Sequence, residues 1–243
     1  MTAWRLVDSG VIAPARSAAV DEAILIARGG GAVPNTLHLY QRSRPTVSLG
    51  HFEKVADRVD LTAAERYGVA LVRRMSGGSA IYSGPDQLTY AVAVGQGDVP
   101  ESPQETFSLL CRGVICALDH LGLEASFKPV NDVLVRGRKI SGSAQVRRHG
   151  AVLQHGTLLV RNDYERMFAV LRASKRTAEQ MTSLAEELAD VPPMDVIKRA
   201  VVDGFSGALN AGIVEGELSG SERKSADELV RTRYGSPDHT FLY

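Results

Sequence analysis

A charged hairpin near the middle of the chain constrains the fold more than any other stretch. Residues 133–135 are apolar and β-prone, residues 136–138 (Arg-Gly-Arg) have the composition of a tight turn, and Lys139 opens a second strand. Small residues follow the lysine, and a glycine among them lets a bulky ligand approach the backbone. The segment is therefore either an ordinary exposed hairpin or part of a binding site. Its candidate site residues are Asn131, Asp132, Lys139, Ser141, Gly142, Ser143 and Ala144.

A second informative stretch is a strand that runs into two arginines and a glycine-rich loop. Arginine offers a planar fork of donors that suits phosphate or carboxylate, and glycines let backbone N–H groups close on an anion. No Lys-Ser/Thr pair follows the glycines, so the loop is not a P-loop. The pattern predicts an anion site, with a loop of solvated arginines as the alternative. The residues concerned are Arg73, Arg74, Ser76, Gly77, Gly78 and Ser79.

A third stretch, residues 151–160, has the composition of a long central strand. Its apolar run is interrupted by His155, Gly156 and Thr157. Polar groups inside a buried strand need hydrogen-bond partners. We therefore expect these three residues to line a site.

Composition narrows the class of protein. The 243 residues allow one large domain or two small ones, and we expect a single domain over residues 1–243. Lys plus Arg (28) equals Asp plus Glu (28), so no overall charge draws the protein to nucleic acid or a membrane. The sequence has no apolar run long enough to span a bilayer and no signal-peptide pattern at its start. With only two cysteines, these features predict a soluble, cytoplasmic protein.

The apolar periodicity predicts alternating strands and helices. Residues 37–40 and 46–49 are expected to form paired strands across a polar turn. A capping box at Ser102 starts a helix that runs to about Leu121 and places Cys111 on its core face. A buried thiol there acts as a small hydrophobe, not a nucleophile. Further strands are expected at 4–7, 69–72 and 88–94, and further helices at 14–28, 61–67, 164–171, 193–209 and 221–234.

Taken together, the three motifs resemble those of the lipoate–protein ligase A family, within the biotin/lipoate ligase-like superfamily. The family pattern is an Arg-Arg-x-Ser/Thr-Gly-Gly-Gly loop, an Asn-Asp strand followed by Lys-x-Ser-Gly-Ser-Ala, and a His-Gly-Thr/Ser strand. The chain carries all three in the same order, from about Trp4 to about Tyr234. The resemblance implies an α+β fold, a mixed β-sheet flanked by helices in a class II synthetase-like catalytic domain. Ser79 and Ser83 depart from the family's usual glycine and histidine.

The resemblance also implies an ATP-dependent lipoate–protein ligase. In this reaction lipoate or octanoate is activated to acyl-AMP, and the acyl group then passes to a specific lysine of a carrier protein. Lys139 would neutralise developing charge as the catalytic residue, and the other candidates would bind ATP or the acyl group. Asp132 would orient adenosine or a Mg²⁺ ion. The acyl tail needs an apolar slot, which is expected to be lined by the strands around Leu71, Tyr90 and Leu158.

The expected carriers are a glycine-cleavage H protein, an E2 lipoyl domain or another lipoyl carrier protein. The resemblance points to a chain without the extra C-terminal domain of longer ligases, so a separately encoded accessory domain is a further expected partner. The polar segment Arg172–Gln180 has the composition of a lid, or of a solvated connection between helices.

Two other functions stay open at this stage. One is a transferase of the same superfamily that moves octanoyl or lipoyl groups between carrier proteins through a cysteine thioester. Such chemistry needs an accessible thiolate, whereas both cysteines are predicted in a helix and position 126 is a serine, so the ligase is the favoured hypothesis. The other is a non-catalytic lipoate-binding scaffold, which Lys139 argues against.

Overall fold

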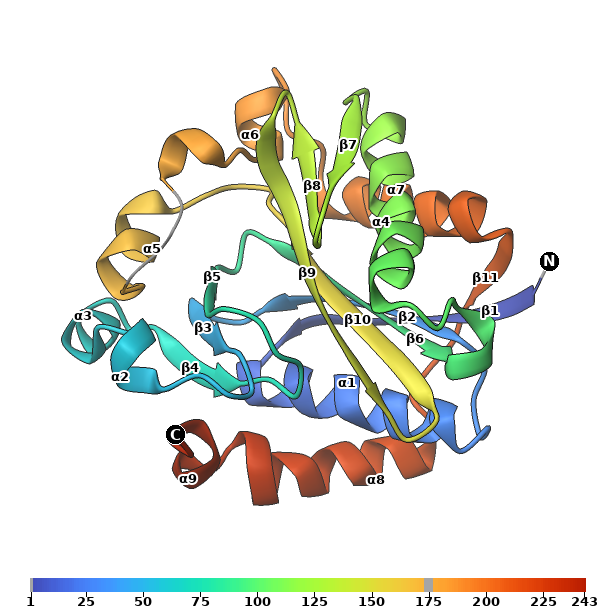
Figure 1. Cartoon of the computed structure of the whole chain (residues 1–243), viewed down its shortest axis with the longest axis horizontal. Coiled ribbons are helices and arrows are strands. Elements are labelled where there is room, and N and C mark those ends of the chain that lie inside the picture. Colours follow the sequence, from blue (N-terminus) through green and yellow to red (C-terminus); the bar gives the residue numbers. More distant parts are fainter. Residues whose placement is uncertain (1, 173–176) are drawn as a thin grey trace.

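The computed structural model describes residues 2–172 and 177–243, and it consists of a large sheet, a small sheet and helices on both faces of the large one (Figure 1). The strands of the large sheet, in spatial order, are β11 (Ala211–Glu215), β1 (Thr2–Ile12), β2 (Thr36–Arg42), β6 (Leu88–Gly95), β10 (Ala151–Leu158), β9 (Arg138–Arg148), β8 (Asp132–Val135) and β7 (Ala125–Lys128). Strand β1 is parallel to both of its neighbours, and the other pairs are antiparallel. The expected α+β fold with a mixed sheet is confirmed.

The small sheet contains β4 (Ala70–Arg73), β3 (Thr46–Leu49) and β5 (Ile81–Ser83) in that order. Strand β3 therefore belongs to a different sheet from β2. The predicted pairing of residues 37–40 with 46–49 is wrong, because the chain between them crosses to the second sheet instead of closing a hairpin.

The longer helices cover the large sheet from two sides. Helices α4 (Pro103–His120) and α7 (Met194–Leu209) pack against each other on one face, while α1 (Pro14–Gly29) and α8 (Gly220–Leu229) lie on the other (Figure 1). The remaining helical segments are α2 (Val55–Arg58), α3 (Leu61–Arg66), η1 (Gln96–Asp98), α5 (Tyr164–Val170), η2 (Ala178–Gln180), α6 (Leu184–Glu187), η3 (Val230–Tyr234) and α9 (Pro237–Thr240). No helix in the described part of the chain is long and apolar enough to cross a membrane.

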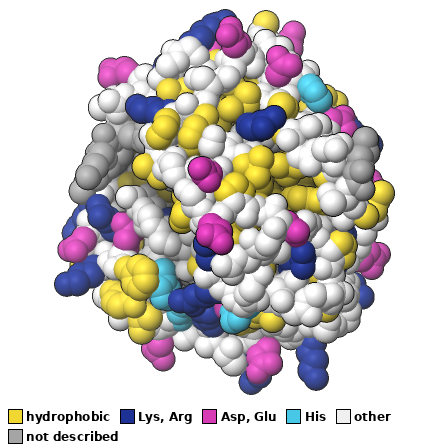
Figure 2. All heavy atoms as spheres, turned by 45° about the vertical axis from the view of Figure 1, so that its right-hand side comes forward, with side chains coloured by type: hydrophobic (Ala, Val, Ile, Leu, Met, Phe, Trp, Pro, Cys, Tyr) yellow, Lys and Arg dark blue, Asp and Glu magenta, His cyan; other side chains and the backbone are white. Residues whose placement is uncertain are grey.

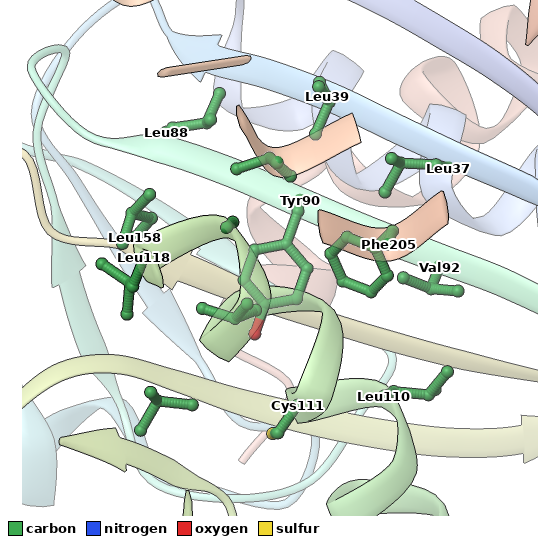
Figure 3. Packing of buried hydrophobic residues seen from close by; sticks show 14 of the residues in the cluster. Leu37, Leu39, Leu88, Tyr90, Val92, Leu110, Cys111, Leu118, Leu158 and Phe205 are labelled. Atoms are coloured by element: carbon green, nitrogen blue, oxygen red, sulfur yellow. The ribbon is translucent and has the colours of Figure 1, made fainter. Parts of the chain in front are cut away.

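The core under α4 and α7 is close-packed. The Tyr90 and Phe205 rings lie 5.7 Å apart between the sheet and the helices (Figure 3). A Cβ on Gly204 would lie 2.5 Å from the backbone of Ala117, so the two helices approach at a contact that only glycine allows. Cys111 is fully buried in this core, which confirms its predicted position on the apolar face of α4 (Figure 3).

The opposite face of the large sheet is more polar. Side chains alternate along a strand, so the neighbours of Tyr90 and Leu158, namely Thr89 and Thr157, point away from α4 and α7. Acidic and basic side chains are interspersed over the surface seen in Figure 2, in keeping with zero net charge. The polar inner face, and not a charged outer surface, is where the site lies.

Candidate active site

A cavity of about 340 Å³ is lined by residues from both sheets and from α5. Its floor is a row of residues that stand opposite one another in five neighbouring strands of the large sheet. The row comprises Tyr40, Thr89, Thr157, Gly142 and Asp132. Because neighbouring strands lie about 4.8 Å apart, the cavity floor is about 14 Å long between Tyr40 and Gly142.

Lys139 and Asp132 form an ion pair at one end of this row. The Lys139 Nζ lies 2.7 Å from Asp132 Oδ1, and the two side chains are only 19% and 7% exposed. The hairpin predicted from the sequence creates this geometry, since β8 and β9 are joined at Arg136 and Gly137. A Cβ on Gly142 would lie 2.3 Å from Lys139 Nζ, so the glycine makes room for the ammonium over the sheet.

A second row of residues lies beside the floor and carries a buried hydrogen-bond network. His38 and His155 are both opposite Ala91, one on each neighbouring strand, so the small alanine side chain separates two imidazoles. Asp21 of α1 lies against both rings: its Oδ1 is 2.8 Å from His38 Nδ1, and its Oδ2 is 3.3 Å from His155 Nδ1. The Tyr40 hydroxyl also donates to Asp21 at 3.2 Å.

These contacts stabilise the ionised form of Asp21. Burial alone would raise the pKa of this carboxyl, but the hydrogen bonds from His155 and His38 outweigh it and lower the pKa to about 2. A carboxylate accepts hydrogen bonds, so both rings present an Nδ1–H to it. In the neutral ring the other nitrogen is then an acceptor, and His155 Nε2 lies 2.7 Å from Ser76 Oγ.

The two arginines of the glycine-rich loop have different environments. Arg74 lines the cavity, and its guanidinium donates to the carbonyls of Ser48, Gly77 and Ser79. Burial lowers the pKa of Arg74 to about 10. Arg74 therefore holds the loop in shape, and part of its donor capacity is used by the protein itself.

Arg73 points away from the cavity and is fully buried. Its guanidinium donates to five backbone carbonyls, at distances of 2.7–3.2 Å, which join the loop after β3 to helix α9. The acceptors are Gly50, His51, Glu53, His239 and Thr240. The predicted contact of Arg73 with an anion is thus not the contact that this structure gives it.

Most of the predicted site residues come together around the cavity. Those that line it are Arg74, Gly78, Ser79, Asn131, Asp132, Lys139, Gly142, Ser143, Ala144, His155, Gly156 and Thr157. Arg73, Ser76, Gly77 and Ser141 lie outside the lining, and Ser141 faces the core, 3.3 Å from the Tyr90 hydroxyl. The binding roles of these residues remain predictions.

The slot was expected along the strands around Leu71, Tyr90 and Leu158, and the strands of Tyr90 and Leu158 do line the cavity, through Thr89 and Thr157. Tyr90 and Leu158 belong to the core under α4 and α7, and Leu71 packs in the small-sheet core, so none of the three lines the cavity. Their sequence neighbours Thr89, Thr157 and Val72 have the opposite orientation, because a one-residue step along a strand changes the face. The apolar part of the cavity lining comes from residues that no sequence pattern singled out, among them Ile81, Leu159, Met167 and Met181.

Asp21, His38 and Tyr40 were also missed. A carboxylate at position 21, in a helix whose neighbours are mainly apolar, was the signal that could have found Asp21.

The predicted lid falls partly on residues 173–176, which lie outside the described residues. Of its described residues, Arg172 pairs with Asp60 at 3.2 Å and residues 178–180 form η2.

The lining offers little to hold a metal ion. Asp132 is the carboxylate among the described cavity residues, and it is paired with Lys139. Within residues 2–172 and 177–243, no group of three His, Cys, Asp or Glu side chains is arranged to bind a metal. A Mg²⁺ ion takes one or two carboxylates plus substrate phosphates, so this donor set alone does not make a magnesium site.

This geometry has known counterparts. Residues 13–206 match the model of the lipoyl protein ligase A/B catalytic domain, and the chain belongs to this family. The fold is therefore that of an enzyme of the lipoate and octanoate ligase–transferase group.

Individual relatives refine this assignment. The octanoyltransferase LipM of Kyrpidia tusciae is 34% identical, over 95% of this chain and 96% of its own. A bi-partite lipoate protein ligase from Thermoplasma acidophilum, studied with its E2 lipoyl domain, has a TM-score of 0.89 at 26% identity, covering 99% and 97% of the two chains. A lipoate-protein ligase A bound with ATP has a TM-score of 0.88 at 27% identity, covering both chains fully.

The relatives correct the sequence-based prediction of function. The expectation of an ATP-dependent ligase is wrong, because the similar curated proteins are octanoyltransferases over nearly their whole length. The resemblance identified the family, which is confirmed, but it did not predict the type of reaction.

Proposed function

We propose that this protein transfers an octanoyl or lipoyl group from a thioester on one carrier protein to a lysine amine on another. The observation that carries the proposal is the Lys139–Asp132 pair at one end of a long, partly apolar cavity. The similarity to octanoyltransferases supports the choice of reaction, since a thioester is already activated and its acyl transfer needs no nucleotide.

The residues account for the chemistry of acyl transfer. The acyl chain lies along the cavity floor, with its carbonyl carbon beside Lys139 and its tail toward Tyr40. Attack by an amine places negative charge on the carbonyl oxygen, which the Lys139 ammonium stabilises. One well-placed donor of this kind contributes roughly 100- to 1000-fold in rate.

The remaining groups position Lys139 and exclude water. Asp132 holds the ammonium at 2.7 Å, and Gly142 leaves the space that its approach requires. The His155 ring is fixed by Asp21 and Ser76 in the neighbouring row, so it forms a rigid wall beside the acyl chain.

The proposed partners are two carrier proteins. The donor carries the acyl thioester, and the acceptor is a lipoyl-type domain with a lysine that can enter the cavity. An E2 lipoyl domain is our proposed acceptor class, supported by the lipoyl domain studied with the Thermoplasma acidophilum ligase.

The test is a reconstituted transfer. Purified protein would be incubated with octanoyl-loaded acyl carrier protein and an E2 lipoyl domain, and octanoylation of the domain followed by intact-mass spectrometry. We expect octanoyl-lipoyl domain without ATP or Mg²⁺, and none when the protein is omitted. A product that forms only when ATP and free octanoate are supplied would contradict the proposal.

A further inference from the structure

Arg42, at the end of β2, is a buried cation in the lining of the cavity. The residue is only 6% exposed, and its Nη1 donates to the Ser17 hydroxyl at 3.2 Å and to the Pro14 carbonyl at 3.4 Å. Both distances are long for an N–H···O hydrogen bond. Within the described residues, no carboxylate forms an ion pair with Arg42, and its Nε has no hydrogen-bond partner. Burial of a guanidinium is unfavourable unless another group pairs with it.

The other arginines that are buried in the described chain have better partners. Arg5 forms an ion pair with Glu222 at 2.6 Å. Arg73 and Arg74 donate to backbone carbonyls at 2.6–3.2 Å. Within this part of the chain, Arg42 is therefore the buried arginine whose donors are most open to a ligand.

Arg42 lies at the end of the cavity that is far from Lys139. Tyr40 is the last residue of the cavity floor, and Arg42 follows two residues later in β2, so both side chains are on the same face of the strand. The guanidinium carbon of Arg42 lies 5.9 Å from the centre of the Tyr40 ring. An acyl chain whose carbonyl is beside Lys139 therefore brings its far end toward Arg42.

A second polar group without a partner lies at the same end of the cavity. Gln41 donates to the Pro85 carbonyl at 2.8 Å, which holds the segment 83–87 beside the end of β2. Ser83, at the start of this segment, lines the cavity and is 1% exposed, and its hydroxyl has no hydrogen-bond partner among the described residues. Buried hydroxyl groups are normally hydrogen-bonded. Two side chains from different strands thus leave polar atoms open at one end of the cavity.

A hydrogen-bond acceptor on the acyl chain would pair with these groups. The Arg42 guanidinium and the Ser83 hydroxyl are both donors, and an oxygen atom at the far end of the chain can accept from them. A methyl group in the same place would leave the cation and the hydroxyl facing hydrocarbon, which is unfavourable. The sulfur atoms of a lipoyl group are weaker acceptors than oxygen.

We propose that Arg42 determines the specificity of the cavity for acyl chains whose far end carries a hydrogen-bond acceptor. The inference rests on the proposed transferase function, which assigns the cavity to an acyl group. The preferred substrate class is an acyl chain with oxygen at its far end, followed by lipoyl groups and then by octanoyl groups. One hydrogen bond to a charged group corresponds to a preference of roughly tenfold to a hundredfold.

The test is a competition between two donors. Equal amounts of acyl carrier protein, loaded with octanoyl or with ω-hydroxyoctanoyl groups, compete for a limiting amount of E2 lipoyl domain, and intact-mass spectrometry measures the two products. We expect at least about tenfold more of the ω-hydroxyoctanoyl product. Titration calorimetry of octanoate and ω-hydroxyoctanoate with the unaltered protein should give the same order of affinities without any transfer step.

Variants test the role of the arginine itself. Arg42→Met removes the cation but keeps an unbranched side chain, so the octanoyl group should be transferred faster and the preference should be reversed. Arg44→Met is the matched control, because Arg44 is exposed and donates to the Gly68 carbonyl at 2.8 Å outside the cavity lining. Its substitution should leave the product ratio unchanged. A thermal melt identifies a variant that unfolds, in which case the two measurements on the unaltered protein decide.

The outcomes separate this inference from the proposed function. Equal transfer of the two acyl groups by the unaltered protein, or equal product ratios in the Arg42→Met and Arg44→Met variants, would overturn the role of Arg42 and leave the transferase function standing. Tighter binding of ω-hydroxyoctanoate without transfer from either donor would contradict the proposed function and support the polar end of the cavity.

Discussion

Lys139 and Arg73 were both predicted to bind an anion, but the structure places one of them in the cavity and the other in the protein interior. Both are cations at the start or end of a strand beside glycines, and both were predicted to meet a negatively charged substrate group. Lys139 is partly exposed and lines the cavity, where its Nζ lies 2.7 Å from the carboxylate of Asp132. Arg73 is fully buried and donates to five backbone carbonyls.

The difference shows that a basic residue next to glycines is not in itself an anion site. Glycine lets the backbone approach closely, and the approaching group can be a substrate or the protein's own carbonyls. At Lys139 the carbonyls are paired in the sheet, so the ammonium is turned toward the cavity. At Arg73 the loop after β3 meets α9 without forming a sheet. The carbonyls of these two segments accept their hydrogen bonds from the Arg73 guanidinium instead.

The largest effect that this comparison predicts is on stability. Arg73→Ala should lower the free energy of unfolding by about 4 kcal/mol, because each buried carbonyl left without a donor costs about 1–3 kcal/mol and water can reach some of them. Urea denaturation measures this change. Arg73→Lys, which keeps the charge but not the fork, should recover only part of the loss. A fall below about 1 kcal/mol for Arg73→Ala would contradict the role of Arg73 in the fold.

Lys139→Ala should have the opposite effect, with a large loss of transfer rate and little loss of stability. We expect the transfer rate to fall about 100- to 1000-fold, because the oxyanion loses its nearest cation, while the melting temperature barely changes. Octanoylation of the lipoyl domain under single-turnover conditions measures the rate. Arg138→Ala is the matched control, since Arg138 is the adjacent cation of the hairpin and pairs with Glu187 outside the cavity at 2.6 Å. Equal losses in the two variants would remove Lys139 from the mechanism.

A third prediction concerns the buried carboxylate. The pKa of Asp21 is lowered from 3.8 to about 2, so ionised Asp21 stabilises the fold above pH 4 and this stabilisation is lost as pH falls from about 4 toward 2. The shift corresponds to about 2 kcal/mol. Asp21→Asn should lose a similar amount at pH 7. Unfolding free energies at pH 7 and pH 3 should differ less in the variant, and an unchanged pH dependence would argue against the Asp21 network.

The smallest expected effect is at Gly142. A Cβ there would lie 2.3 Å from Lys139 Nζ, and the flexible lysine would move aside, so Gly142→Ala should slow transfer about tenfold with little loss of stability. Gly207→Ala is the control, because its added Cβ meets no atom within 4 Å. A variant as fast as the unaltered protein would show that the position of the ammonium is less restricted than the structure indicates.

The sequence predicted the elements better than their pairing. Capping, proline and apolar periodicity are local signals, and they located α1, α4, α7 and the β8–β9 hairpin closely. The separation of β2 and β3 into two sheets depends on which distant strands they meet, β6 for one and β4 and β5 for the other. Such pairings are set by tertiary packing, for which a single sequence carries no local signal.

Many polar residues of the candidate site were predicted from the sequence, but its apolar walls and the network of Asp21, His38 and Tyr40 were not. His155 stood out because a polar group inside a buried strand needs hydrogen-bond partners. Lys139 stood out because small residues follow it and let a ligand approach the backbone. The apolar walls have no such signal, and the prediction of Tyr90 and Leu158 in place of Thr89 and Thr157 shows how one residue decides the face. The reaction type also could not be predicted, since it depends on how the acyl group arrives and not on the motifs that hold it.

The cavity floor has a further consequence, because it crosses the strands instead of following one of them. Its length is set in steps of one strand spacing, about 4.8 Å each, and each step is represented by one side chain of the row. The number of strands that the cavity floor crosses therefore sets the longest acyl chain that the cavity can hold. A bulky side chain at Thr89 would shorten the usable length by about one step, and one at Thr157 by about two.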